Sequence, residues 1–314
     1  MPPDTDAHAQ EHAQAQAHTY AHARRDDQPE ETRRVLLSRT FDEDAELYDR
    51  ARPGYPPELY DDLVDLAGAR PGRRVLEIGC GTGQATVPLA ALGCRITAVE
   101  AGPRMAAVAR RNLAEAEAEA EVGAEDRAGA EAGVGVGSAE VVTAEFENWP
   151  LPAEPFDVVL AATAFHWIDP AVRVSRAADA LRPGGALAVV RGQHVWGGTE
   201  EFFVEVQRCY ERFDPATQPG TRPPEADDVD NSDHAEEVAR NGRFGETVFR
   251  RYAWDLTYTT AEYLDVLRTY SGHRALPDAA RNGLLACVAG LIDGRYDGRV
   301  TKRYLIELAV SQRN

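Results

Sequence analysis

The segment Val75-Leu-Glu-Ile-Gly-Cys-Gly-Thr-Gly83 constrains the fold of this chain more than any other part of the sequence. The apolar residues from Arg74 to Ile78 predict a buried strand, and the three glycines after it predict a tight turn into a helix. Glycine allows the backbone to pass close to a ligand, and the first turn of a helix offers unpaired N–H groups. The segment therefore predicts a strand–turn–helix unit that binds a small molecule, although a merely tight turn would need the same glycines.

An acidic residue stands at the end of the next predicted strand. Glu100 follows the apolar segment 95–99, 17 residues after Gly83. A carboxylate at this place can accept hydrogen bonds from both hydroxyls of a ribose. The dinucleotide fingerprint needs a third glycine at position 84, where this chain has Gln84. The G-x-G-x-G spacing therefore favours a ligand with a ribose and a small charged tail over a dinucleotide.

Strand and helix patterns alternate through the middle of the chain and predict an α/β fold with a parallel, doubly wound sheet. After residue 192 the pattern loosens into helices and two long strands, and a loop rich in proline and aspartate is expected from the end of the helix at 200–212 through about residue 237. We expect strands at 74–78, 95–99, 141–143, 157–161, 186–190, 247–258 and 300–310, and helices at 57–67, 83–92, 103–118, 170–181, 200–212, 261–269 and 277–292.

These patterns also predict how the chain is organised. Residues 1–34 lack an apolar period and should form a disordered tail, and 119–138 are too rich in glycine and acid to pack, which predicts a flexible insertion. We expect helices that form a lid at 35–70, a Rossmann-like cofactor-binding core at 71–192, and cap helices with sheet-completing strands at 193–314.

The composition excludes several classes of protein. The net charge of −18 comes mainly from three acidic stretches, at 1–34, 115–140 and 225–237, and no basic stripe suits nucleic acid. No apolar run approaches the ~20 residues that span a bilayer. The start of the chain lacks a secretory signal, and the four cysteines lack metal-ligand spacing. We therefore expect a cytoplasmic protein with no metal site, no membrane contact and buried free thiols.

Several segments together resemble the class I S-adenosylmethionine-dependent methyltransferases, particularly the small-molecule branch that includes trans-aconitate methyltransferase. The matching segments are Tyr48–Pro56, Val75–Gly83, Val99-Glu100, Phe156–Trp167, Leu181–Gly185 and, near the C-terminus, Leu267–Ser271. The resemblance implies a mostly parallel seven-stranded sheet with helices on both faces, an antiparallel last strand and N-terminal lid helices. It also implies S-adenosyl-L-methionine as the cofactor.

The resemblance further implies which residues bind the cofactor. The glycines would line its methionine part, Glu100 would bind the ribose hydroxyls, and Ala144 with Glu145 would flank the adenine. Tyr48 and Arg52 would form a lid over the carboxylate and methyl group, with helix packing as an equal alternative. The expected cofactor-binding residues are Tyr48, Arg52, Glu77, Gly79, Gly81, Thr82, Gly83, Glu100, Ala101, Ala144, Glu145 and Ala162.

His166 is the candidate catalytic residue, because it follows a central strand at the sheet edge where α/β folds bind ligands. It could take a proton from an acceptor, or it could simply be hydrogen-bonded within the loop. Arg191, Arg268 and Arg274 could bind a carboxylate or lie on the surface.

We expect an enzyme that moves a methyl group to a small carboxylate, hydroxyl or amine, as a monomer or homodimer. A non-catalytic cofactor-binding scaffold stays open as an alternative. A nicotinamide-dependent oxidoreductase is disfavoured by Gln84 and by the position of the only lysine, Lys302.

Overall fold

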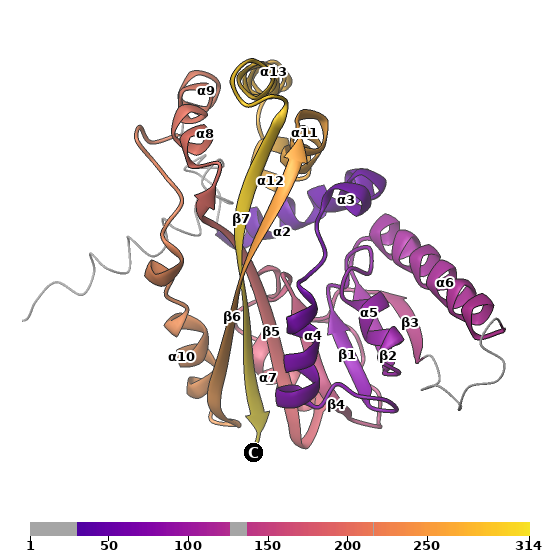
Figure 1. The fold of residues 1–314 in the computed structure, drawn as a ribbon. Helices are drawn as coiled ribbons and strands as arrows, with labels where there is room; N and C mark the ends of the chain where they lie inside the picture. Colours follow the sequence, from indigo (N-terminus) through magenta and orange to yellow (C-terminus); the bar gives the residue numbers. More distant parts are fainter. Residues whose placement is uncertain (1–29, 126–136, 216) are drawn as a thin grey trace, which may run out of the picture. The chain divides into compact units, whose positions relative to one another are not determined.

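The computed structural model describes residues 30–125, 137–215 and 217–314 (Figure 1). These residues divide into two compact units. Among the described residues, unit 1 comprises those up to Phe41 together with Gly192–Asn231 and Ala253–Leu305. Unit 2 comprises Asp42–Arg191, Ser232–Tyr252 and Ile306–Asn314. Most of the predicted N-terminal tail, residues 1–29, and the middle of the predicted insertion, residues 126–136, lie outside the described residues.

Seven strands form one sheet in the order β3-β2-β1-β4-β5-β7-β6. β1, β2, β3, β4 and β5 pair in parallel, with Val75 of β1 opposite Ile96 of β2 and Val158 of β4. The strands are β1 (Arg74–Ile78), β2 (Arg95–Glu100), β3 (Ser138–Thr143), β4 (Phe156–Ala162), β5 (Leu181–Gly198), β6 (Phe244–Thr259) and β7 (Arg299–Arg313).

The last strand runs against its neighbour β6. Thr257 of β6 is hydrogen-bonded to Thr301 of β7 at 2.7 Å, and Thr247 of β6 is bonded to Ser311 of β7 at 2.8 Å. Residue numbers therefore rise along β6 while they fall along β7, which is the antiparallel arrangement. The expected fold, a mostly parallel seven-stranded Rossmann-like sheet with helices and an antiparallel last strand, is confirmed.

The helices of unit 2 include the expected N-terminal helices and the crossovers between parallel strands. A mostly apolar strand such as β4, whose residues 158–161 are all buried, needs cover on both faces. The helices of this unit are α3 (Ala45–Ala51), α4 (Pro57–Asp62) with the π-helical turn η3 (Leu63–Ala67), α5 (Thr86–Ala91), α6 (Pro103–Glu125), η4 (Phe165–Trp167), α7 (Arg173–Ala180) and α10 (Ser232–Asn241).

Two acidic segments are more ordered than the sequence predicted. α6 continues through residues 119–125, which we had placed in a flexible insertion, because alanine and glutamate are good helix formers. Residues 232–237 begin α10, although the acidic run predicted a loop. His234 and Val238, four residues apart, are buried on one face of α10, and its Glu237 pairs with Arg173 of α7. The many acidic residues of this segment made the short buried stripe of His234 and Val238 hard to recognise in the sequence.

Unit 1 contains the helices that the sequence predicted at 200–212, 261–269 and 277–292, with small differences in their bounds. It also contains helical segments at 30–39, 226–228 and 271–274 that were not predicted, and the first of these begins within the expected disordered tail. The helices of this unit are α2 (Glu30–Arg39), α8 (Glu200–Glu205), α9 (Gln207–Phe213), the short turn η5 (Ala226–Asp228), α11 (Thr260–Arg268), α12 (Ser271–Arg274) and α13 (Asp278–Arg295). Thr259 caps α11 through its side chain, and Glu262 completes a capping box. Throughout the described part of the chain, no helix has the length and apolar character to span a bilayer.

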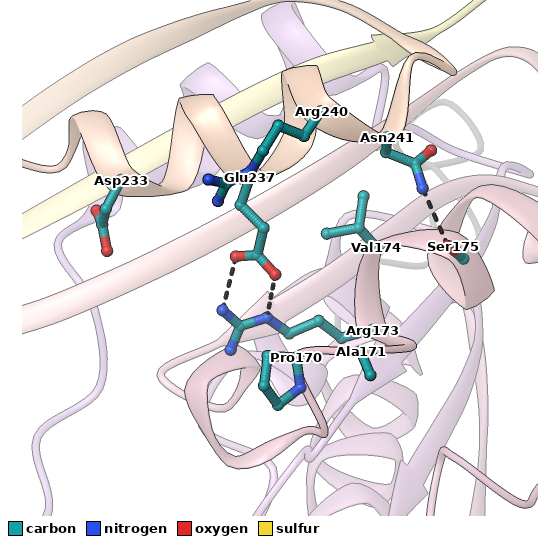
Figure 2. A pocket seen from close by; sticks show the side chains of 9 residues that line it. All are labelled: Pro170, Ala171, Arg173, Val174, Ser175, Asp233, Glu237, Arg240 and Asn241. Carbon is teal, nitrogen blue, oxygen red and sulfur yellow. Dashed lines mark hydrogen bonds and ion pairs between the residues drawn. The ribbon is translucent and has the colours of Figure 1, made fainter.

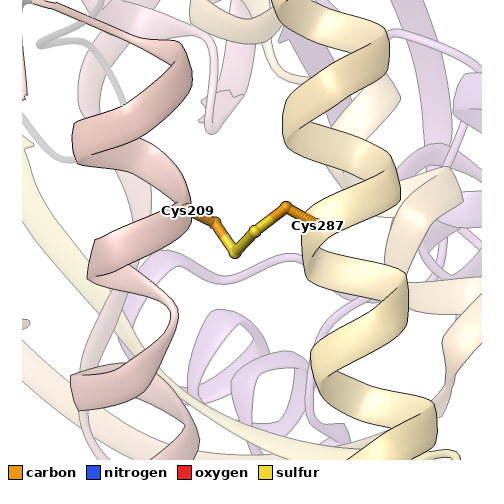
Figure 3. The surroundings of a disulfide bond; sticks show 2 residues. All are labelled: Cys209 and Cys287. Carbon is orange, nitrogen blue, oxygen red and sulfur yellow. A yellow bond between two sulfur atoms is a disulfide. The ribbon is translucent and has the colours of Figure 1, made fainter.

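A disulfide joins α9 to α13 within unit 1 (Figure 3). It links Cys209 and Cys287, whose Cα atoms are 5.8 Å apart and which are separated by 78 residues in the sequence. The expectation of four free thiols is therefore wrong for this pair, because only helix packing brings the two cysteines together. Cys80 and Cys94 are buried free thiols, as expected.

Candidate active site

The glycine turn after β1 has the backbone conformation that the motif predicts. Gly79, Gly81 and Gly83 have φ angles of 67°, 60° and 97°, a region that glycine enters without the cost borne by other residues. A methyl group on Gly79 would also lie 2.7 Å from Cβ of Ala164, in the loop after β4. The turn is thus held against the ends of two adjacent strands, β1 and β4.

Replacing Gly79 by alanine should destabilise the protein more than the same change at Gly72. Both residues have positive φ, but a methyl group on Gly72 would meet nothing within 4 Å. Gly72→Ala should therefore cost about 1–2 kcal/mol from backbone strain alone. Gly79→Ala should cost about 1–3 kcal/mol more, because the methyl group also overpacks Ala164. Urea unfolding of the two variants measures this difference, and equal losses would show that the close approach to Ala164 is not tight.

Glu100 ends β2 with its carboxylate turned to the glycine turn. Its Oε2 accepts a hydrogen bond from the Gly81 amide at 2.9 Å, and its Oε1 accepts one from the Gly102 amide at 2.8 Å. Burial raises the pKa of Glu100, and hydrogen bonds from the Gly102, Gly81 and Ala101 amides oppose this shift. An ionised carboxylate has about four acceptor positions, so these amides still leave room for a ribose hydroxyl. The side chain therefore fits the ribose role.

The residues expected at the adenine lie at the ends of β2 and β3. The Ala144 amide donates to the carbonyl of Glu100 at 2.9 Å, which fixes the two strand ends side by side. Ala101 and Glu145 are exposed, and Glu145 Oε2 accepts from Nδ2 of Asn148 at 3.1 Å. The structure thus brings Ala101 and Ala144 together with Glu100, and it leaves the Glu145 carboxylate at the surface.

The predicted lid residue Tyr48 reaches the glycine turn. A methyl group built on Gly81 would lie 3.9 Å from the Tyr48 ring, and the guanidinium of Arg52 is 5.2 Å from the centre of that ring. Asn112 of α6 donates from Nδ2 to Asp49 of α3 at 2.8 Å and to the carbonyl of Thr82 at 2.9 Å. Asn112 therefore ties the lid helix to the turn, a role the sequence analysis missed.

Two other predicted cofactor residues are buried, Glu77 in β1 and Thr82 within the glycine turn. Glu77 is 1% exposed and accepts from the hydroxyl of Thr86 at 2.7 Å. Burial raises the pKa of Glu77 to about 8, and the charge of Glu100 adds to this shift. Thr82 is also 1% exposed, and its Oγ1 accepts from Gln84 Nε2 at 2.7 Å. Both side chains have partners within this strand–turn–helix unit, and their contact with a cofactor stays a prediction.

The loop after β4 contains Ala162 and the candidate catalytic residue. Thr163, next to Ala162, has a φ of 55° and its hydroxyl is 2.9 Å from that of Tyr55. His166 lies in η4, half-buried, with its ring 4.7 Å from the ring of Trp167. Burial, together with the charges of Arg191 and Arg173, lowers the pKa of His166 to about 3. A neutral imidazole of such low basicity is a weak proton acceptor, so the base role stays a prediction.

A second histidine lies beside this loop and was missed by the sequence analysis. His234 of α10 is 1% exposed, and its ring is 5.8 Å from that of Phe165. Among the described residues, neither of its ring nitrogens has a hydrogen-bond partner. The charges of Arg191 and Arg173 act on His234 as they do on His166. We call His166, His234, Arg173 and Arg191 the basic cluster. The sequence analysis could not predict this cluster, because it placed His234 in a loop rather than in a helix.

The free energy of unfolding should fall as the pH drops below about 6.5, and His234 should contribute to this loss. Burial lowers the pKa of His234 to about 3, with Arg191 of β5 and Arg173 of α7 adding to the shift and Asp233 opposing it. The unfolded histidine, with a pKa near 6.5, therefore takes up the proton first, and stability present above that pH is lost toward pH 3. Each histidine of this kind contributes at most about 1.4 kcal/mol per pH unit.

Urea unfolding between pH 7 and pH 5 tests this with His234→Gln, which keeps a polar side chain but does not titrate. The variant should lose less stability over this range than the wild type. An acid slope identical in the two proteins would show that His234 is not a protonation site of the unfolding transition.

The arginines considered as carboxylate binders already have partners. Arg191 pairs with Asp233 at 3.1 Å, and Arg268 pairs with Asp265 at 2.6 Å. Arg274 is hydrogen-bonded to the carbonyl of Arg268 at 3.5 Å. Of these, Arg191 belongs to the basic cluster. The described ranges hold no group of three or more side chains that could bind a metal ion together.

A polar pocket lies between α7 and α10 (Figure 2). Arg173 and Glu237 form a two-pronged ion pair in it, with both N–O distances at 2.6 Å. Asn241 Nδ2 donates to the hydroxyl of Ser175 at 3.0 Å. The pocket contains none of the predicted cofactor residues, and its central ion pair holds α10 against α7.

Comparison with known proteins identifies the part of the chain that carries this site. Residues 76–189 match the profile of the family described as "Methyltransferase domain". The match runs from β1 into β5 and includes the glycine turn, Glu100 and the β4 loop. Residues 76–189 are therefore similar to a methyltransferase domain. The resemblance to methyltransferases seen in the sequence is thereby confirmed, while the resemblance to the trans-aconitate branch stays a prediction.

The curated relatives share the methyltransferase domain over part of their length. An uncharacterized methyltransferase of Mycobacterium tuberculosis is 36% identical over 154 residues, which is 49% of this chain and 52% of the relative. One from Schizosaccharomyces pombe is 26% identical over 175 residues, 55% of this chain and 59% of the relative. The chain therefore spans about half the length of the curated relatives it matches.

A solved structure shares the fold of the methyltransferase domain. A candidate type II methyltransferase from Anaeromyxobacter dehalogenans superimposes with a TM-score of 0.52 at 21% identity, covering 84% of this chain and 97% of that one. At this level of identity the likeness concerns the fold alone.

Proposed function

We propose that this chain transfers the methyl group of S-adenosylmethionine to a small-molecule acceptor bearing a carboxylate, hydroxyl or amine. The observation that carries the proposal is the Glu100 carboxylate, which the Gly81 and Gly102 amides hold at 2.9 and 2.8 Å at the end of β2, beside the glycine turn. A dinucleotide is a poorer fit, because Gln84 stands where a pyrophosphate site needs glycine.

The residues of unit 2 would act mainly by placing the reactants. S-adenosylmethionine, when bound, supplies an electron-poor methyl carbon on its sulfonium. Glu100 would fix the ribose, the glycine turn would accommodate the methionine part, and Tyr48 would cover it. Alignment of the acceptor and exclusion of water account for most of the rate in such a displacement. His166 and His234, as neutral imidazoles, would orient the acceptor by hydrogen bonds rather than carry charge.

We further propose that the acceptor is a free small molecule and that the protein works without nucleic acid, as a monomer or homodimer in the cytoplasm. The net charge of −18 supports the proposal that the protein works without nucleic acid, since a polyanion would be repelled. The basic cluster supports it too, because each of its two arginines is already paired with a carboxylate, which leaves little positive charge to bind a polyanion.

The experiment is untargeted mass spectrometry of a metabolite extract incubated with the protein and S-adenosylmethionine labelled in its methyl group. We expect the label to appear in one small acid, alcohol or amine with the wild type and to be strongly reduced with Glu100→Ala. Binding of S-adenosylhomocysteine with no label transferred to any acceptor would favour a non-catalytic scaffold instead.

A further inference from the structure

The only lysine of the chain is buried in unit 1 among tyrosines. Lys302 of β7 is 5% exposed, on the strand face that also carries Val300 and Tyr304. Its Nζ donates to the hydroxyl of Tyr270 at 2.6 Å, and it lies 5.0 Å and 4.7 Å from the ring centres of Tyr270 and Tyr304. The ammonium therefore lies at the hydroxyl edge of Tyr270 and beside the ring of Tyr304.

No carboxylate of the described chain lies within 4 Å of this ammonium. The next residue of β7 shows the contrast, since Arg303 forms a two-pronged ion pair with Asp255 at 2.7 Å. Charges that leave water are ordinarily paired, because an isolated buried ion costs several kcal/mol. Lys302 has three N–H donors, and only one of them has an acceptor in the described residues.

The tyrosines around Lys302 extend a hydrogen-bonding network without supplying a negative charge. The hydroxyls of Tyr258 and Tyr304 are 3.1 Å apart, and that of Tyr210 is 3.1 Å from Nε2 of His273. Burial raises the pKa values of Tyr210 and Tyr304 far above neutrality, so these hydroxyls stay protonated. The surroundings thus offer hydrogen-bond donors and aromatic walls around one unbalanced positive charge.

We propose that Lys302 and Tyr270 form a binding site for the carboxylate of a small organic acid. One ammonium balances one carboxylate, and the tyrosine rings can pack against the organic body that carries it. A phosphate dianion would leave a charge unbalanced and would gain nothing from the rings. Tyr270 is half-buried, so this pair of residues reaches the surface through the tyrosine rather than through Lys302, which is 5% exposed.

The site lies wholly within unit 1 and does not depend on the proposed methyl transfer. Because Lys302 is the only lysine, isotope-labelled lysine gives the full-length protein a single side-chain NMR signal at this site. Benzoate serves as the probe, with benzamide as the uncharged molecule of the same shape and inorganic phosphate as the second anion. We expect a saturable shift of the Lys302 signal with benzoate, at least ten times weaker with benzamide and with phosphate.

Variants separate binding from a structural role. Lys302→Met should fold, because an apolar side chain of similar length commonly replaces a buried ion without loss of stability. It should abolish the rise in melting temperature that benzoate gives the wild type, and Tyr270→Phe should reduce that rise. The matched control is Arg303→Met, which removes the neighbouring paired cation and should keep the full response to benzoate.

The proposal is overturned if benzoate leaves the Lys302 signal unmoved, or if benzamide moves it equally. An equal response to phosphate would mean that the site takes any anion, which contradicts the assignment to a carboxylate. Calorimetry with S-adenosylhomocysteine on the same samples keeps the two proposals apart, since Lys302→Met should leave cofactor binding unchanged whatever it does to benzoate.

Discussion

Replacing Glu100 by alanine is expected to weaken the binding of S-adenosylhomocysteine by one to two orders of magnitude while the protein stays folded. The carboxylate would accept two ribose hydroxyls in charge-assisted hydrogen bonds, which are stronger than neutral ones. Its loss leaves those hydroxyls poorly paired, at a cost of about 1–3 kcal/mol. Isothermal titration calorimetry measures the change. Glu100→Asp should lose less, because the carboxylate survives one methylene short.

The control for this prediction is Glu140→Ala on the adjacent strand β3, where the side chain is exposed. It removes one negative charge from the same unit without touching the glycine turn, so it should bind S-adenosylhomocysteine like the wild type. If Glu100→Ala bound as tightly as Glu140→Ala, the ribose would be held by a different acid, and the assignment of the β2 end would be wrong.

Reduction of the disulfide between Cys209 and Cys287 is expected to lower the free energy of unfolding by about 2–4 kcal/mol, because a cross-link that closes a long loop restricts the unfolded chain. The two cysteines are 78 residues apart. Denaturant unfolding with and without a reducing agent measures the loss. The double variant Cys209→Ser/Cys287→Ser should match the reduced wild type.

The same double variant is the control for the reducing agent. It keeps the free thiols Cys80 and Cys94, so the reducing agent should leave its stability unchanged. Four reactive thiols in the denatured, unreduced wild type would show that the disulfide does not form. Two would show that it does.

The sequence predicted the part of the site that depends on local backbone chemistry. The glycines of the turn and Glu100 are close in the chain to the strands that present them, and strand periodicity places them at one edge of the sheet. For the same reason β1, with the bounds Arg74–Ile78, was predicted to the residue. Local sequence patterns of this kind predict the folded structure well, because few other backbone conformations are compatible with them.

Contacts between distant segments could not be predicted in this way. Asp42 accepts from the amides of Arg104 and Met105 at 2.7 and 3.0 Å and so caps α6, although it lies about 60 residues earlier in the chain. The contacts of Asn112, of the two disulfide cysteines and of His234 could not be predicted for the same reason. These side chains reach their partners only when helices pack together, and no spacing in the sequence indicates which helices will pack.

The predicted loop before residue 237 shows how composition can mislead. Its acidic residues suggested a solvated segment, and α10 forms there because two buried positions four residues apart are enough to pack a short helix. One of those acidic residues, Glu237, forms an ion pair with Arg173 at 2.6 Å and so links α10 to α7. This unforeseen helix brings His234 to the loop after β4.

The most direct test of the account is calorimetric titration of the full-length protein with S-adenosylhomocysteine and, separately, with NAD. The account predicts saturable binding of S-adenosylhomocysteine at one site per chain and no heat from NAD, because Glu100 fits a ribose and Gln84 blocks the pyrophosphate turn. Binding of NAD with no heat from S-adenosylhomocysteine would contradict the assignment of this site to a methyl donor.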